Sequence, residues 1–329
     1  MHVSANDDRK RCGEPGTAFA AAAGTPLILR NPELAAQLNG DAARRRHVVV
    51  AGDCAASAAP PAFTRPSVRT MRRGAEIVRI GGRRLRLDED SCLVVNAGGE
   101  RSSCYVGESG VSPLLVIFEP RSLAQSLAAA DVAFGISGPA RDDFEFLETL
   151  QPRTGAVAQQ LAGIERCLHD GDALALEQRI VLLLSATIAA DRQMREREGT
   201  MAAVKPATRR EVLRRVLMAS DFIQSSYAEP VTLQHIAAAA HLSPFHLVRL
   251  FRRVHGLTPH AYLTRKRLEV ALRLVSQTAL GLDDIAERAG LGTRSSLFRH
   301  LRRQQGSGAS ALRARDPSFM EQRACTTHV

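Results

Sequence analysis

The chain has 329 residues, a formal net charge of +10 and six cysteines. This length accommodates two domains with separate hydrophobic cores. The cysteines, at positions 12, 54, 92, 104, 167 and 325, include no Cys-x-x-Cys pair, which argues against a zinc ribbon or zinc finger. The first residues lack a signal-peptide pattern, and no apolar run reaches the about 18 residues that span a bilayer. We therefore expect a cytoplasmic chain with reduced cysteines and no membrane partner.

The positive charge is concentrated in the C-terminal third. Residues 208–315 contain 18 Lys and Arg against 7 Asp and Glu, whereas the rest of the chain contains 26 against 27. A local excess of basic residues is typical of a nucleic-acid-binding domain, although a solubilising surface would give the same charge.

Strand patterns fill the region from His47 to about Glu119, after an Ala/Gly-rich tail at 1–25 that we expect to be disordered. Two alternating segments flank a Gly-Gly turn, and two short apolar runs follow. These segments lie at 76–80, 81–82, 84–87, 91–96 and 114–118. Several short strands at this spacing predict a small β-barrel or jelly roll within an N-terminal domain at 26–198.

Two apolar stripes with helical periodicity follow the strands. The first consists of Val157, Leu161, Ile164 and Leu168, and the second of Leu176, Ile180, Leu183 and Thr187. Both stripes can pack against the barrel, or one can pair with its copy in a second subunit. The charged run at 191–198, followed by residues 199–207 with Pro206, is typical of a solvated linker.

A helix-turn-helix pattern occurs twice in the basic third of the chain. Its first part, IAAAAHL at 236–242, recurs as IAERAGL at 285–291. After the turn, the matched positions are Leu247, Arg249, Phe251 and Gly256 in the first unit and Leu297, Arg299, Leu301 and Gly306 in the second. Two such units predict a surface that reads two stretches of DNA.

Capping residues mark where the helices of these units begin. Side chains that can cap a helix N-terminus stand at Thr232, Ser243, Thr258 and Thr293, and proline follows Ser243 and Thr258 at the first helical position. They predict helices from Leu233, from Pro244 to His255, and from Pro259 to about Val275, the last of which bridges the two units. An amphipathic helix at 209–227 precedes them.

The tight turn differs between the two units. The second unit has Gly290 there, where a left-handed backbone is easiest, whereas the first has His241, which tolerates that backbone less well.

The second helix of each unit carries candidate DNA-contacting side chains on the face opposite its apolar stripe. An arginine can donate two hydrogen bonds to a guanine edge, and an apolar side chain can contact a thymine methyl. The base-edge candidates are Phe245, His246, Val248, Arg249, Arg294, Ser295, Phe298 and Arg299. The phosphate candidates, one turn further on, are Arg252, Arg253, Arg302 and Arg303.

Two alternatives remain open at this interface. Phe298 either contacts thymine methyl groups, stays an exposed aromatic, or packs against the neighbouring helix. The basic cluster at 265–267 is either a solvated face or lies against a phosphate backbone.

With these units, the segment from about Arg209 to Arg313 resembles the DNA-binding domain of the AraC/XylS family of transcription regulators. The motif GLTPHAY at 256–262 is close to the family pattern, whereas Leu291, Ala309 and Leu312 depart from it. The resemblance implies two recognition helices in successive major grooves, about 34 Å apart. It also implies an N-terminal cupin-like barrel that binds an effector or dimerises.

Enzyme chemistry has little support in the N-terminal domain. Catalytic cupins hold a metal through several histidines, yet this chain has none between His47 and His169. We therefore expect no metal, no cofactor and no catalytic residues. Cys92 and Cys104, in strands predicted to be adjacent, with Cys54 nearby, are either a minor redox-sensor candidate activated by Arg101 or buried apolar side chains.

Together these patterns predict an α+β chain: a cupin-like β-barrel with packed helices at 26–198, a linker at 199–207, an all-α domain at 208–315 with two helix-turn-helix units joined by a bridging helix, and a tail at 316–329. The predicted function is sequence-specific transcription regulation, with an N-terminal domain that senses a small molecule or dimerises. The alternative is an effector-independent regulator whose N-terminal domain only dimerises. The expected partners are promoter DNA, a second copy of the chain, a small-molecule effector and, for an activator, RNA polymerase.

Overall fold

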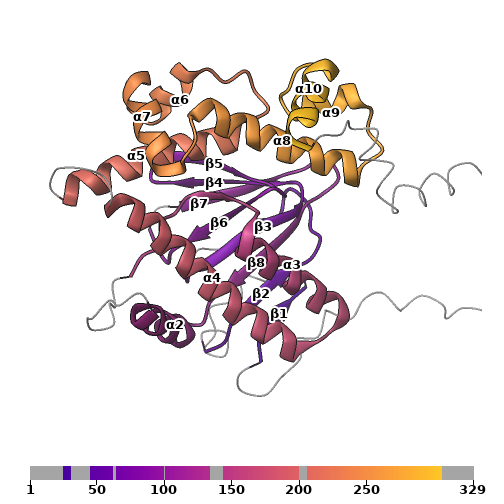
Figure 1. Ribbon diagram of the computed structural model, residues 1–329. Coiled ribbons are helices and arrows are strands. Elements are labelled where there is room, and N and C mark those ends of the chain that lie inside the picture. Colours follow the sequence, from indigo (N-terminus) through magenta and orange to yellow (C-terminus); the bar gives the residue numbers. More distant parts are fainter. Residues whose placement is uncertain are drawn as a thin grey trace, which may run out of the picture.

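A computed structural model describes residues 25–30, 45–61, 64–99, 101–133, 144–199 and 206–305. Strands and three helices form an N-terminal domain, and six further helices form a C-terminal domain that lies across one side of it (Figure 1). The predicted tail at 316–329, and nearly all of that at 1–25, lie outside the described residues.

Nine strands form two sheets in the N-terminal domain. A six-stranded sheet has the order β1-β2-β8-β3-β6-β9, and a three-stranded sheet has the order β5-β4-β7. The strands are β1 (Leu27–Leu29), β2 (Val48–Ala51), β3 (Ser67–Arg73), β4 (Ala75–Ile80), β5 (Arg83–Leu87), β6 (Ser91–Val95), β7 (Arg101–Val106), β8 (Ser112–Ile117) and β9 (Leu150–Pro152). The predicted hairpin is confirmed, because β4 and β5 pair antiparallel around Gly81 and Gly82, both of which have positive φ.

The six-stranded sheet is covered on both faces, which explains why β2, β6 and β8 are buried throughout. One face packs against helices around Val68, Val116 and Ile180, and part of the other packs against the three-stranded sheet around Leu93 and Leu85. Among the strands that the structure describes, the two sheets do not close into a barrel. The predicted cupin-like barrel is therefore wrong in its closure, because local strand patterns do not determine whether the outer strands pair.

Three helices complete the N-terminal domain: α2 (Pro120–Ala133), α3 (Gly155–Asp170) and α4 (Ala173–Gly199). Both predicted apolar stripes lie on α3 and α4 and are buried within this chain, so the stripe at 176–187 packs internally and does not face a second subunit. By length and composition, Ala173–Arg197 could also cross a membrane, and it is the one such helix among the described residues. Because its buried side chains complete the core, we assign it to the core.

The charged run at 191–198 is part of α4 and is not a solvated linker. Asp191 is buried and accepts hydrogen bonds from Leu147 N and Arg195 Nε, at 2.7 and 2.6 Å. Arg192 is also buried and pairs with Asp131 of α2. The run is dense in charge, which predicted solvation, whereas in the folded chain Asp191 pairs with Arg195 one turn later and Arg192 pairs with Asp131, which is 61 positions away. Only residues 200–205 of the predicted linker lie between the helices α4 and α5.

The C-terminal domain is all helical, as predicted. Its helices are α5 (Pro206–Ser226), α6 (Leu233–Ala239), α7 (Pro244–His255), α8 (Pro259–Gln277), α9 (Leu282–Arg288) and α10 (Arg294–Gln305). The α5–α7 helices share one apolar cluster, centred on Leu247 and Phe251. The α9 and α10 helices share another, centred on Ile285 and Leu297. The long helix α8 contributes side chains to both clusters, so it bridges the two units.

Candidate nucleic-acid interface

The predicted caps are confirmed in both helix-turn-helix units. The Thr232 hydroxyl accepts a hydrogen bond from His235 N at 3.2 Å, and Ser243 accepts one from His246 N at 3.4 Å. Thr293 accepts one from Ser296 N at 3.2 Å, at the start of α10. These contacts satisfy amides that a helix start leaves unpaired, so they fix where each recognition helix begins.

The turn between the helices has the same backbone in both units. His241 has a φ of 52° and Gly290 a φ of 71°, both left-handed. The backbone at Gly290 also lies close to the end of α5, because a Cβ there would lie 2.5 Å from the carbonyl oxygen of Tyr227. Thus the glycine of the second unit is required by space as well as by backbone conformation.

The outward face of α7 combines apolar and basic side chains. Phe245 is 77% exposed, and His246, Arg249, Arg252 and Arg253 are also exposed. A shallow groove of about 690 Å³ runs along this face, lined by Leu233, Pro244, Phe245, Val248, Arg249, Arg252 and Arg253. Leu233 and Pro244 were predicted only as helix starts. The sequence signal that could have placed Leu233 here is an apolar residue directly after the cap Thr232, at the first position of the helix.

The corresponding face of α10 is more polar. Arg294, Ser295, Arg299 and Arg302 are exposed. Phe298 instead packs against the apolar cluster of the second unit, with the Arg294 guanidinium 5.4 Å from its ring centre. Of the three interpretations of Phe298, packing against its own domain is the one that the structure supports. The side chain of Arg303 lies outside the described residues.

Residues 265–267 of α8 do not form a uniformly solvated face, because all three side chains make contacts within the chain and Lys266 is buried. Arg265 pairs with Glu269 and lies over the Tyr262 ring. Lys266 is buried, with Nζ 3.7 Å from Asp88 Oδ1, and Arg267 donates hydrogen bonds to the carbonyl oxygens at Tyr227 and Glu229. Lys266 therefore supports the docking of the two domains and Arg267 that of α8 against the end of α5, whereas Arg265 pairs within its own helix.

Aromatic packing closes the end of α7. The His255 ring lies 4.4 Å from the Phe251 ring and 5.1 Å from the Tyr262 ring, measured between centroids. Burial lowers the pKa of His255 to about 4, and the nearby cations Arg197 and Arg265 act in the same direction. The ring is therefore neutral at physiological pH and serves as part of the core.

The cysteines do not form the predicted adjacent pair. Cys92 is on β6 of the six-stranded sheet, whereas Cys104 is on β7 of the three-stranded sheet. Burial raises the pKa of the Cys92 thiol to about 12, the opposite of what a sensor thiol needs. Arg101 forms an ion pair with Glu148. Within the described ranges, no three His, Cys, Asp or Glu side chains gather into a group that could hold a metal.

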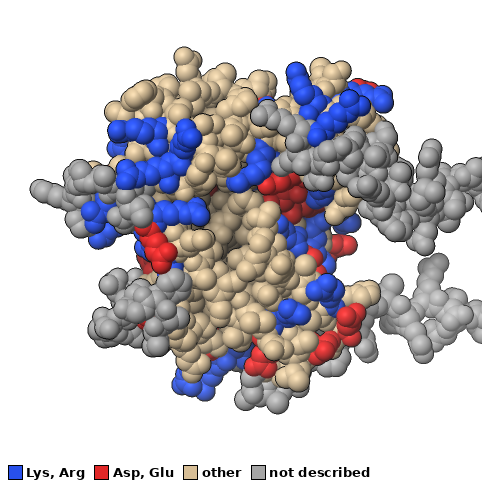
Figure 2. Space-filling model, viewed as in Figure 1, with Lys and Arg blue, Asp and Glu red and all other residues tan. Residues whose placement is uncertain are grey.

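Basic side chains lie over both halves of the C-terminal domain, and acidic side chains gather below them, towards the N-terminal domain (Figure 2). On the recognition helices, the described side chains with a formal charge are all arginines. This surface therefore presents two separate basic helix faces.

Comparisons with known proteins find relatives of the helix-turn-helix segment. Residues 236–315 match the family described as a helix-turn-helix domain. The RCS-specific HTH-type transcriptional activator RclR of Escherichia coli (strain K12) is 36% identical over 84 residues, 26% of this chain and 30% of that protein. The bifunctional transcriptional activator/DNA repair enzyme AdaA of Bacillus subtilis (strain 168) is 27% identical over 103 residues, 31% of this chain and 48% of that protein.

Among solved structures, the DNA-binding domain of AdpA in complex with a target DNA is 28% identical, with a TM-score of 0.29. That match covers 35% of this chain and 96% of the AdpA chain. This chain spans less than half the length of the curated relatives described above, and the family match lies in its C-terminal part. The C-terminal domain, with two capped helix-turn-helix units on one bridging helix, is an AraC/XylS-type helix-turn-helix domain.

Proposed function

We propose that the chain is a sequence-specific transcription regulator that binds promoter DNA with α7 and α10 in successive major grooves. The observation that carries this proposal is the pair of capped helices, each presenting exposed arginines on the face opposite its buried stripe. An α-helix fits the major groove, and two grooves on one face of the duplex are separated by about 34 Å, one helical turn.

Arg249 of α7 and Arg299 of α10 are the proposed guanine contacts, because both are exposed and lie in the first two turns of their helices. Phe245, with its high exposure, is the proposed contact to a thymine methyl in the first half-site. The flanking residues His246, Val248, Arg294 and Ser295 complete the proposed base contacts. Phe298 packs partly against the apolar cluster of the second unit, and its exposed part stays a candidate for contact with a thymine methyl.

Phosphate contacts are proposed for Arg252, Arg253, Arg302 and Arg303 at the later turns of the same helices. Arginines placed beside the base-reading positions bind the backbone and set the register without reading sequence. They also make affinity strongly dependent on salt, because each phosphate contact releases counterions.

The proposed role of the N-terminal domain, at about 26–199, is to receive a small molecule or to pair two copies of the chain. The pairing alternative has one favourable observation: the outward face of α4 exposes Leu174, Val181 and Leu182. A thermal-shift screen of the full chain against small molecules tests the sensing role, since a ligand of the folded state must raise stability. Sedimentation of wild type and Leu182→Glu tests pairing at this face.

The remaining parts of the proposal follow from the regulatory role. We infer that the chain acts in the cytoplasm, is not an enzyme, needs no cofactor or metal, and contacts RNA polymerase if it activates transcription. The DNA-repair activity in the name of AdaA is not proposed for this chain, because the proposal rests on the helix-turn-helix segment alone.

Selection of duplexes from a random pool by the full chain tests the central proposal. Two half-sites about one helical turn apart should emerge, and the affinity for the selected site should fall steeply with salt. Recovery of no common sequence, or binding that is insensitive to salt, would overturn it.

A further inference from the structure

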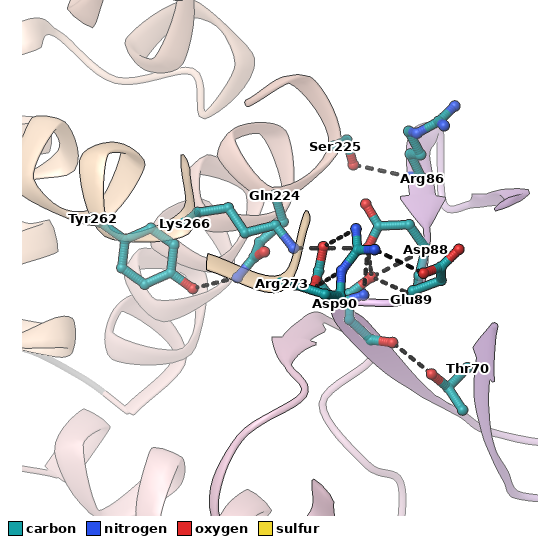
Figure 3. Close-up of polar contacts among 11 residues, drawn as sticks. Thr70, Arg86, Asp88, Glu89, Asp90, Gln224, Ser225, Tyr262, Lys266 and Arg273 are labelled. Atoms are coloured by element: carbon teal, nitrogen blue, oxygen red, sulfur yellow. Dashed lines mark hydrogen bonds and ion pairs between the residues drawn. The ribbon is translucent and has the colours of Figure 1, made fainter. Parts of the chain in front are cut away.

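The bridging helix α8 is held against the N-terminal domain by an ionic contact at its C-terminal half. The Arg273 guanidinium binds Asp90 in a bidentate manner, with Nε–Oδ1 at 2.6 Å and Nη2–Oδ2 at 2.9 Å. Its third nitrogen, Nη1, donates to Glu89 Oε2 at 2.8 Å. Figure 3 shows the guanidinium surrounded by the acidic turn at 88–90. We call this contact the α8 clamp.

The α8 clamp is reinforced about two turns earlier on the same face of α8, by Lys266. Lys266 is only 1% exposed, and its ammonium lies 3.7 Å from Asp88 Oδ1 and 5.1 Å from the Tyr227 ring centre. Three consecutive carboxylates of the N-terminal domain therefore face two cations of α8. A bidentate arginine pair is the strongest geometry available to such a contact.

A second ionic contact holds the first half of the C-terminal domain. Arg83 of β5 binds Asp221 of α5, with Nη1–Oδ2 at 2.5 Å. The other carboxylate oxygen of Asp221 accepts hydrogen bonds from Thr149 Oγ1 and Leu150 N, at 2.6 and 2.7 Å. The amide of Arg86 adds a hydrogen bond to Ser225 Oγ at 3.0 Å. We call this set of contacts the α5 clamp.

The two clamps are attached to different helix-turn-helix units. Asp221 lies on α5, which packs in the cluster of the first unit. Arg273 lies in the stretch of α8 whose apolar side chains, such as Val270 and Val275, pack in the cluster of the second unit. Thus the N-terminal domain contacts both units at once. Both clamps come from the run of chain between Arg83 and Asp90 and from the neighbouring β9, and α4 adds a hydrogen bond from Arg197 to the Val254 carbonyl oxygen in the first unit.

With both clamps closed, the outward faces of the proposed DNA-reading helices α7 and α10 are exposed. In Figure 1, α7 and α10 project from the C-terminal domain on the side away from the sheets. Their arginines at 249, 252, 299 and 302 are exposed while both clamps are closed. The closed state is therefore compatible with DNA binding, which argues for a positioning role of the clamps rather than a blocking role.

We propose that the N-terminal domain is a bracket that fixes the relative position of α7 and α10 through the two clamps, and so sets the half-site spacing that the chain accepts. This inference rests on the proposed function, since it assigns Arg273 and Asp90 as positioning residues for DNA reading. Bending or twisting of α8 would change the separation of the two helices. A bracket attached on both sides of that helix suppresses this motion and favours one spacing.

The decisive measurement is spacing discrimination by two variants that break the same contact with opposite changes of charge. Arg273→Gln removes a positive charge, and the double variant Glu89→Gln/Asp90→Asn removes two negative charges. Affinity is measured for the selected site and for a copy with one extra base pair between its half-sites. We define the ratio as the dissociation constant for the duplex with the extra base pair divided by that for the selected site. This ratio should fall by about threefold or more in both variants.

The ratio separates positioning from simple electrostatics, because both duplexes present nearly the same phosphate charge to the protein. If the clamps act only through charge, the two variants shift overall affinity in opposite directions and leave the ratio unchanged. That result would overturn the proposal. A cavity of about 720 Å³ lies beside the α8 clamp and is lined by Glu89, Asp90 and Arg273, and also by Arg72. Arg72→Gln is the matched control, since Arg72 is exposed and takes no part in the clamp contacts given above. It should keep the wild-type ratio.

Two further measurements check that any loss of discrimination comes from the broken ionic contact. The charge swap Asp90→Arg/Arg273→Asp, made together with Glu89→Gln to remove the remaining carboxylate, restores an ion pair and should recover discrimination. Failure to recover it while the chain stays folded would count against the bracket. Amide hydrogen exchange without DNA should be faster in the C-terminal half of α8 in Arg273→Gln than in wild type. If wild type selects no DNA sequence, the proposed function fails, while the exchange result still reports whether the clamp restrains α8.

Discussion

His241 and Gly290 occupy equivalent turn positions in the two helix-turn-helix units and share a left-handed backbone, with φ of 52° and 71°. The two positions nevertheless differ in their surroundings. Gly290 lies against the end of α5, where an added Cβ would meet the Tyr227 carbonyl oxygen at 2.5 Å and the Ala228 Cα at 2.9 Å. His241 is exposed. The same turn is therefore strained by a side chain in one unit and closed to any side chain in the other.

Reciprocal substitutions at this turn should change stability in opposite directions. His241→Gly should stabilise by up to about 1 kcal/mol, because glycine removes the left-handed penalty of a non-glycine residue. Gly290→Ala should destabilise by about 1–3 kcal/mol, because backbone strain adds to the steric conflict. Urea unfolding of the full chain measures both. A Gly290→Ala variant as stable as wild type would contradict the close approach to Tyr227.

Arg249 and Arg252 should behave differently on DNA, although both are exposed on α7. Arg249→Ala should cost about 1–3 kcal/mol and relax the preference at one base position, as expected for a guanine contact. Arg252→Ala should weaken binding to all sequences alike and reduce the salt slope by about one contact. Competition binding against single-base variants of the selected site distinguishes them. Uniform weakening by Arg249→Ala would reassign it to phosphate.

The helices of the C-terminal domain could be predicted from sequence because their boundaries are set locally. Thr232, Ser243 and Thr258 cap the amides of the residues that follow them, so the signal and the contact lie within one turn. The hairpin around Gly81 and Gly82 was predictable for the same reason. Even the difference at the turn between the two units was visible as histidine against glycine.

The sheet closure and the domain contacts could not be predicted because they join residues far apart in the chain. Asp90 and Arg273 are 183 positions apart, and nothing local marks either as a partner. The charges at 191–198 looked solvated until their partners were in place. Likewise, Phe298 on a recognition helix fits exposed and packed roles equally well, and only the position of the neighbouring helices decides between them.

The buried ion pair between Arg69 and Glu76 should be strongly coupled. It joins the two sheets, with Arg69 Nη1 2.8 Å from Glu76 Oε1 and both side chains almost fully buried. Arg69→Met should destabilise by about 3–5 kcal/mol, because the Glu76 carboxylate would remain buried without its cation. The double variant Arg69→Met/Glu76→Leu should recover most of that loss. Urea unfolding of the three proteins gives the coupling, and additive effects would contradict a direct pair.

Two buried histidines should make the protein less stable as the pH falls below neutrality. Burial lowers the pKa of both His47 and His255 to about 4. The His47 Nδ1 atom accepts a hydrogen bond from Glu119 N at 3.1 Å, which requires a neutral ring. In the unfolded chain both rings take up protons near pH 6.5, so the free energy of unfolding should fall between about pH 6.5 and 4. Each histidine contributes up to about 1.4 kcal/mol per pH unit.

The contribution of His255 to the pH dependence of the unfolding free energy is measured by comparing wild type with His255→Phe. This variant keeps an aromatic ring between Phe251 and Tyr262. The difference in unfolding free energy between wild type and this variant should grow steadily as the pH is lowered from 6.5, and it should level off below about 4, where the folded protein also binds the proton. Burial raises the pKa values of Glu89, Asp221 and Glu269, so these carboxyls act in the opposite sense. They are common to both proteins and cancel in the difference. A difference that does not vary with pH would show that His255 titrates alike in the folded and unfolded chain.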